Sequence, residues 1–120
     1  MTIERRGTTR RYSDSVAFGD TVHLVEVAQN LDGDITAQTR EVLASVEQTL
    51  ISAGSDKSRL LQVTIYLADI AEIDVMNAVW DNWVPEGSAP ARACVQARLA
   101  NPAYRIEVVV LAACQNAPDN

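Results

Sequence analysis

The sequence Ile106-Glu-Val-Val-Val-Leu-Ala-Ala113, near the carboxyl end of the chain, decides the fold. It is rich in β-branched residues and predicts a β-strand that is apolar on both faces. Such a strand needs burial on both sides of its sheet. The rest of the chain contains only two helix patterns, and two helices can cover one face. We therefore expect another copy of the chain to cover the other face, which makes the protein a homo-oligomer.

The segments before this strand alternate between strand and helix patterns. Gly19-Asp20 separates two strand-like runs and is typical of a tight hairpin turn. Residues 36–53 carry apolar side chains on one side, as an amphipathic helix does, and Gly54 is a typical residue to end it. The expected order is β-β-α-β-α-β-β, over residues 12–18, 21–28, 36–53, 61–67, 69–84, 91–99 and 104–114. This order predicts an α+β fold in which two helices cover one face of a mixed sheet.

The composition is that of one globular domain. The 120 residues are 48% hydrophobic and 22% charged, and a chain of this length normally supports one core. We expect a single domain over residues 1–120, with residues 115–120 as a flexible tail. Residues 1–11 contain four arginines and carry a net charge of +3, whereas the remaining residues carry −9. The acidic body argues against a nucleic-acid partner, and the basic end is expected to be a solvated terminal segment.

The sequence contains none of the common metal, membrane or nucleotide motifs. Cys94 and Cys114 are too few for a disulfide framework, and with the single histidine, His23, they cannot supply a zinc site. No run of 18 apolar residues and no signal-peptide pattern occurs, so we expect a cytoplasmic protein with no membrane partner and reduced thiols. Glycine-rich phosphate loops, nucleophile elbows and dinucleotide fingerprints are absent from the sequence as well.

Two charged residues late in the chain are the strongest candidates for a site. Arg92 begins a strand of small residues, so it is either a surface arginine at a sheet edge or a guanidinium that binds a carboxylate in a cleft. Glu107 lies in the apolar last strand, where a carboxylate needs an ion-pair partner or a function. If a four-residue loop at 100–103 joins the two strands as a hairpin, Gln96 lies opposite Glu107, which then shares a face with Arg92. A five-residue loop would place Glu107 on the other face.

Other reactive or aromatic side chains have structural explanations beside functional ones. Cys94 could be a nucleophile, but a small buried cysteine is expected because no histidine lies near it in the sequence. His23, in mid-strand, is expected to be a packed residue rather than a catalyst. Trp80 and Trp83 lie about one helical turn apart and are core or interface residues, with a pocket wall as the alternative. Tyr12 either caps a pocket or begins a strand.

The stretch Pro90-Ala-Arg-Ala-Cys-Val-Gln-Ala-Arg-Leu99, followed by Arg105-Ile-Glu-Val108, resembles the signature of the RidA (YjgF) family of enamine/imine deaminases. The shared pattern is Pro-x-Arg-x-Cys-Val, with a glutamate thirteen residues beyond the cysteine. The resemblance extends over nearly the whole chain. The Trp80/Trp83 pair is more similar to a divergent subgroup of YoaB-type bacterial proteins.

This resemblance implies a chorismate-mutase-like fold assembled as a homotrimer. The three sheets would form a central barrel, with the sites in clefts between subunits and no cofactor. Arg92 would bind the carboxylate of a small metabolite, the Cys94 backbone would position substrate or water, and Glu107 would activate the attacking water. Tyr12 would line the cleft. The implied reaction hydrolyses reactive 2-imino or enamine acids to 2-keto acids and ammonia.

One segment departs from the family pattern. Where the deaminases usually carry a small Ser-Gly-Gln-like run, this chain has Val25-Glu26-Val27, which would line the substrate pocket. A carboxylate at Glu26 would weaken the binding of an anionic substrate. The alternative to a deaminase is therefore a non-enzymatic module of the same fold that binds or senses a small carboxylate at Arg92. An endoribonuclease, a function attached to some relatives, fits poorly because the chain has one histidine, one lysine and an acidic body.

Overall fold

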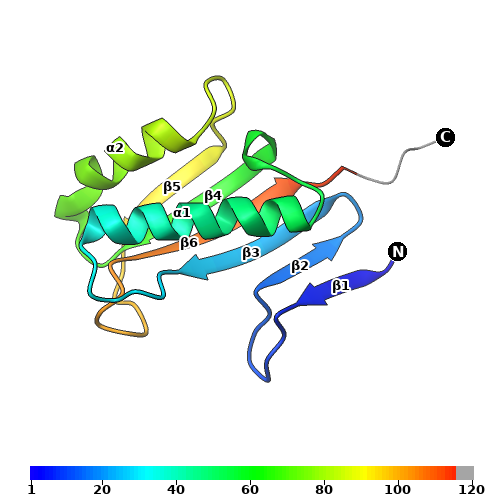
Figure 1. The fold of residues 1–120 in the computed structure, drawn as a ribbon, viewed down its shortest axis with the longest axis horizontal. Coiled ribbons are helices and arrows are strands. Elements are labelled where there is room, and N and C mark those ends of the chain that lie inside the picture. The colour runs from blue at the N-terminus through cyan, green and yellow to red at the C-terminus, as the bar shows by residue number, and fades with distance from the viewer. Residues whose placement is uncertain (116–120) are drawn as a thin grey trace.

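The computed structural model describes residues 1–115 as a six-stranded sheet with two α-helices on one face (Figure 1). The strands are β1 (Ile3–Arg6), β2 (Ser15–Phe18), β3 (Thr21–Val27), β4 (Leu60–Leu67), β5 (Ala91–Gln96) and β6 (Ile106–Ala113), and the helices are α1 (Ile35–Ser52) and α2 (Ile73–Trp83). The strand order is β1-β2-β3-β6-β4-β5, and β4 and β5 form the parallel pair. The expected α+β fold, with two helices covering one face of a mixed sheet, is confirmed.

Helix α1 begins and ends at residues that suit helix ends. The Asp34 carboxylate caps the helix by accepting a hydrogen bond from the backbone N–H of Ala37 at 2.9 Å. Gly54 follows the last turn with a φ of +79°, a left-handed conformation that glycine adopts without a steric penalty. The expected helix end at Gly54 is confirmed.

The first residues of the chain differ from the expected solvated segment. Ile3–Arg6 forms strand β1, which pairs with β2 although its side chains are all exposed. Backbone pairing does not require apolar side chains, so the charged composition gave no sign of this strand. At the other end, the Gln115 N–H donates to the Gly54 carbonyl at 2.7 Å. The rest of the expected tail, residues 116–120, lies outside the described residues.

The core lies between the helices and one face of the sheet. Alternate side chains of the central strands point toward the helices, as strand geometry requires. The buried strand residues are Val22, Leu24, Val63, Ile65, Leu67, Ile106, Val108 and Val110. They pack against Val42, Leu43, Val46, Leu50, Met76 and Trp80 of the two helices. Within residues 1–115, neither helix is long and apolar enough to cross a membrane.

The expected hairpin between the last two strands is wrong. β5 pairs with β4 in parallel and β6 pairs with β4 antiparallel, so β4 lies between them. The connection, residues 97–105, crosses the end of β4 instead of turning back on β5. The Ala97 N–H donates to the Leu67 carbonyl, and the Ala68 N–H donates to the Arg105 carbonyl, both at 3.0 Å. Nine residues are enough to cross one strand, whereas a hairpin would need fewer.

The buried amide of Gln38, on α1, holds this crossing segment in place. Its Nε2 donates to the carbonyls of Gly33 and Ala103, at 3.3 and 3.0 Å, and its Oε1 accepts from the Arg105 N–H at 2.9 Å. Because all three bonds form, a polar group can be 1% exposed without a large desolvation cost. α1 therefore fixes the path of the chain between β5 and β6.

Glu26 points from β3 toward the helices. Its partner in β6 is Val108, whose side chain is buried against the helix layer, and paired residues share a face. The Thr49 hydroxyl of α1 donates to Glu26 Oε1 at 3.3 Å. Burial raises the pKa of the Glu26 carboxyl, the hydrogen bond from Thr49 lowers it in part, and the negative charge of Asp14 adds to the rise.

The substitution Glu26→Gln is expected to stabilise the protein at pH 7. A carboxyl whose pKa is raised by folding costs stability once the pH exceeds that pKa, and costs nothing below the pKa of the unfolded chain. The gain in melting temperature should therefore shrink as the pH is lowered to about 4, where the wild-type carboxyl is protonated. Thermal unfolding followed by circular dichroism would measure this, with exposed Glu86→Gln as the matched control. An equal gain at both pH values would contradict the argument.

Candidate functional site

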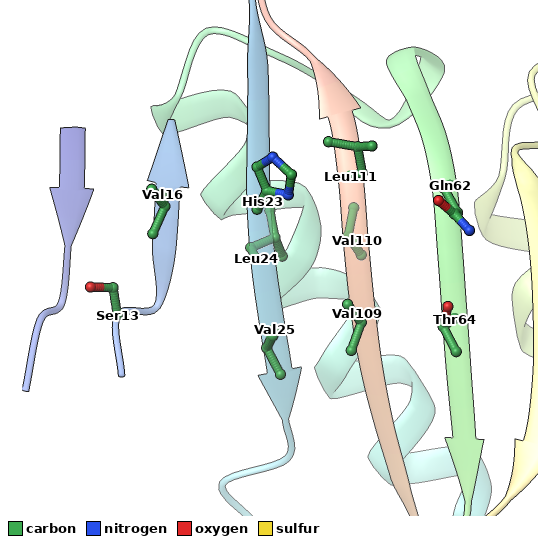
Figure 2. Close-up of a pocket in the computed structure, with 10 residues that line it drawn as sticks. All are labelled: Ser13, Val16, His23, Leu24, Val25, Gln62, Thr64, Val109, Val110 and Leu111. Carbon is green, nitrogen blue, oxygen red and sulfur yellow. The ribbon is translucent and has the colours of Figure 1, made fainter. Parts of the chain in front are cut away.

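The sheet face opposite the helices is largely apolar and is uncovered in the single chain. The register places His23, Leu111 and Gln62 in one row, and Val25, Val109 and Thr64 in the next; Figure 2 shows both rows in front of the helices. These side chains line a shallow hollow of about 360 Å³. Other large apolar side chains on this face, Ile3, Phe18 and Val95, are 42–47% exposed. A surface of this kind usually marks an interface.

Glu107 lies in the next row of the same face. It is directly between Val27 on β3 and Tyr66 on β4. Among the strand residues described on this face it is the one acidic side chain. Within residues 1–115 no hydrogen bond or ion pair occupies its half-buried carboxylate. A carboxylate left free in an apolar setting is available to a water or a ligand.

Arg92 and Cys94 lie on the helix-facing side of the edge strand β5. Their partners in β4 are Val63 and Ile65, which are buried against the helices. The Arg92 guanidinium lies over the ring of Trp80, with its Cζ 5.1 Å from the ring centroid. That distance is within the range of a cation–π contact. Arg92 is therefore held at the sheet edge by α2.

The expected meeting of Arg92, Cys94 and Glu107 on one face does not occur within a single chain. β4 separates β5 from β6, and Glu107 pairs with Tyr66 on the uncovered face, whereas Arg92 faces the helices. The error comes from the hairpin assumption, since the crossing of β4 sets the two strands in a different register. The polar groups that would form one site are thus divided between the two faces of the sheet.

Cys94 is the small, partly buried cysteine that the sequence favoured. It packs against the core, and burial raises the pKa of its thiol, although the positive charge of Arg92 opposes the rise. A raised pKa leaves little thiolate at neutral pH, and thiolate is the nucleophilic form. His23, the single histidine, lies on the uncovered face and cannot serve Cys94 as a base within this chain.

The segment Val25-Glu26-Val27 is divided by the pleat of β3. Val25 and Val27 lie on the uncovered face with Glu107, but Glu26 faces α1. The expectation that Glu26 lines the pocket is corrected, because strand residues alternate between faces. Tyr12 belongs to the loop between β1 and β2 and is 63% exposed, next to Ser13 at the rim of the hollow.

The structure adds Trp80 to the residues around Arg92. The sequence predicted Trp80 as a core or interface residue, and it is 5% exposed. Its contact with Arg92 joins a helix to a strand, so no local spacing could have revealed it. In the part of the chain that the structure describes, no group of three or more His, Cys, Asp or Glu side chains is arranged to hold a metal ion.

Comparison with known proteins supplies the family. A family profile described as "Endoribonuclease L-PSP" matches residues 2–114. The RutC family protein YoaB of Escherichia coli K12 is 43% identical over 113 residues, which cover 94% of this chain and 99% of YoaB. A RutC family protein of Haemophilus ducreyi is 38% identical, over 92% of this chain and 96% of its own.

Solved structures agree with this relation. A YjgF family member from Neisseria meningitidis superimposes with a TM-score of 0.91 at 44% identity, covering 98% of each chain. An uncharacterized protein from Pseudomonas aeruginosa gives a TM-score of 0.92 at 41% identity, covering 95% of this chain and all of its own. By full-length sequence identity and by fold, the chain belongs to the RidA (YjgF, RutC) family.

Proposed function

We propose that the protein is a cofactor-free deaminase that hydrolyses reactive 2-imino and enamine acids to 2-keto acids and ammonia. The observation that carries this proposal is a pair of charges that form no ion pair within residues 1–115, the Arg92 guanidinium at one sheet edge and the Glu107 carboxylate on the uncovered face. The Arg92 guanidinium suits the carboxylate of a substrate, and the Glu107 carboxylate suits a water molecule. Membership of the RidA family supports the same chemistry.

We infer that the site is completed by a neighbouring copy of the chain in a homotrimer. The uncovered face needs an apolar partner, and β1 and β5 are the two edges of the sheet. Closing three sheets into a ring would bring the β5 edge of one copy toward the β1–β2 side of the next. Arg92 and Cys94 of one copy would then share a cleft with Tyr12, Val25 and Glu107 of another.

The reaction needs little from such a site. Protonation makes the imine carbon electrophilic, so the protein has to orient it and deliver water. Glu107 takes a proton from the water as its oxygen adds to that carbon, which gives a carbinolamine. Glu107 then returns the proton to the amine nitrogen, and the carbinolamine hydroxyl loses its own proton as ammonia leaves and the 2-keto acid forms. Arg92 holds the substrate carboxylate through paired N–H donors. An enamine acid enters the same path once its β-carbon is protonated.

The neighbouring residues favour a small substrate. Val25 and Val27 are bulkier than the run that the family usually carries, and they share a face with Glu107. Glu26 points away from that face, so it does not oppose an anionic substrate. Of the two arguments that this segment raised against a deaminase, the negative charge of Glu26 is therefore removed and the bulk of the valines remains.

RNA cleavage, the activity that the matching family profile names, is poorly supported by this chain. His23 is the single histidine, and the net charge of the protein is −6. Cleavage of RNA needs a groove that attracts phosphate, together with a general base beside it. The four arginines of the first eleven residues are all exposed. Of these, Arg5 lies in the same row of the sheet as His23, but Val16 of β2 lies between them.

The first prediction of the proposed function concerns assembly. Light scattering should give a mass of about 39 kDa, which is three chains of 13.1 kDa. Val25→Glu, which places a charge on the uncovered face, should weaken the trimer, whereas exposed Val75→Glu on α2 should not. A stable monomer in the wild type would contradict the proposal.

The second prediction separates the roles of Arg92 and Glu107. Arg92→Ala removes a charge-assisted contact worth about 1.5–3 kcal/mol, so KM should rise roughly 10–150-fold. Arg92→Lys should recover part of the loss, because an ammonium keeps the charge but not the planar geometry. Glu107→Gln keeps the shape and removes the base, so kcat should fall by about 10²–10⁴. Steady-state kinetics with freshly generated imino acids of varied side chain would measure both.

Failure of these kinetic expectations would have distinct meanings. Wild-type protein that binds 2-keto acids through Arg92 but accelerates no hydrolysis would favour the carboxylate-binding module. An unchanged kcat in Glu107→Gln would mean that the bound imine is attacked by water without a base.

The third prediction concerns Cys94. Because its thiol pKa is raised and only its backbone is proposed to contact substrate, Cys94→Ala should keep most of the activity. Assay of the purified trimer would test this, with Cys114→Ala as the matched control. Loss of all activity in a trimeric Cys94→Ala protein would indicate covalent catalysis.

A further inference from the structure

Among the residues that the structure describes, Arg92 is held by an aromatic ring and not by an acidic side chain. Its guanidinium lies 5.1 Å from the centroid of Trp80. Within residues 1–115, no carboxylate or carbonyl oxygen accepts a hydrogen bond from it. Ion pairs are few among the described residues, where Lys57 and Arg105 are the cations that pair with carboxylates. What distinguishes Arg92 from the other arginines without an ion pair is its contact with the Trp80 ring.

The ring beneath Arg92 is itself rigidly placed. Trp80 is 5% exposed in the core, and its ring lies 5.6 Å from that of Trp83 at an angle of 48°. The Trp83 indole N–H donates to Glu47 Oε1 at 3.2 Å, and Lys57 lies 5.7 Å from the Trp83 centroid. The ring that supports the guanidinium is therefore braced from α1 and α2, so its face has little freedom to move.

An aromatic support has a consequence that an ion pair would not have. A carboxylate partner would occupy the N–H donors of Arg92 and neutralise its charge, so a substrate would have to displace it. A ring face holds the guanidinium by its flat side and leaves the edge donors and the charge free. Two parallel N–H groups along that edge match the two oxygens of a carboxylate.

We propose that Trp80 is a positioning residue that holds the Arg92 guanidinium in the orientation in which it binds a carboxylate. The inference rests on the proposed function for Arg92 as the carboxylate ligand, but not on any hydrolytic step. Trp80 then has a second role beside its role in the core. Its ring holds Arg92 in place of an acidic side chain, which would compete with the ligand for the N–H donors of Arg92. Trp80 contacts Arg92 and not the ligand, so it acts through that side chain.

The test compares the substitutions Trp80→Phe and Trp80→Leu with Met76→Ala. Met76 lies one turn earlier on α2 and is fully buried, so its truncation loosens the same helix without removing a ring from Arg92. Each change is made in the wild type and in Arg92→Ala. The readouts are kcat and KM for 2-iminobutanoate, the Kd of the unreactive 2-oxobutanoate by calorimetry, and the melting temperature and mass of each variant.

Trp80→Leu should raise KM and the Kd of 2-oxobutanoate together, by about 3–30-fold, and leave kcat within about twofold. Trp80→Phe should show a smaller rise, because phenylalanine is the weaker partner for a cation. In the Arg92→Ala background neither change should add more than about twofold, since a positioning residue has nothing left to position. Met76→Ala should lower the melting temperature with no change in Kd. If Trp80→Leu does not fold, Trp80→Phe carries the test.

Three results would overturn the inference: an unchanged Kd in both Trp80 variants, an equal loss of affinity with and without Arg92, or the same rise in Kd in Met76→Ala.

Failure of this inference can be distinguished from failure of the proposed function. Wild-type protein that binds 2-oxobutanoate through Arg92, with an affinity that depends on Trp80, but hydrolyses no imine keeps the inference and refutes the deaminase. Hydrolysis with a KM that does not respond to either Trp80 change keeps the deaminase and refutes the inference. A wild type that binds no carboxylate refutes both.

Discussion

The structure depends on one constraint, which is that a sheet with two apolar faces has helices for only one of them. The helix-facing apolar residues Val22, Leu24, Val63, Ile65, Val108 and Val110 are buried, whereas Val25 and Val95 on the other face remain 42–44% exposed. Burying apolar surface stabilises a protein by roughly 25 cal/mol per Å², so leaving this face in water is costly. Association removes that cost without a third helix. The same association is what would bring the edge strands of different copies together.

The path of the chain between β5 and β6 determines on which face of the sheet the candidate site residues lie. Because residues 97–105 cross the end of β4, Arg92 faces the helices and Glu107 faces the uncovered side. Gln38 fixes the crossing through three hydrogen bonds, so the arrangement is not free to relax into a hairpin. In the proposed function, one chain holds the two halves of the site and cannot join them. Activity and assembly would be lost together when the uncovered face is disrupted.

Periodicity was sufficient to predict most of the helices and strands, but not which strands lie side by side in the sheet. The alternation in residues 61–67, the β-branched apolar run at 106–113 and the glycine at position 54 follow local rules, and the structure agrees with them. The positions of β4 between β5 and β6, and of β1 beside β2, depend on backbone pairing across the sheet, which leaves little trace in side-chain pattern. The direction of Glu26 follows from the same pairing. Its neighbour Val25 could be placed on the uncovered face only after the register with β6 was known.

The support of Arg92 illustrates how a site can hold a charge ready for a ligand. A guanidinium at an exposed edge of an acidic protein is attracted to carboxylates on its own chain, and any ion pair it forms lowers its affinity for a substrate. Trp80 provides attraction without hydrogen-bond acceptors, so the competition is avoided. A buried ring also costs nothing extra, because the indole contributes to the core whether or not the arginine is present. In the proposed role, the same side chain would serve the core of α2 and the recognition of a carboxylate.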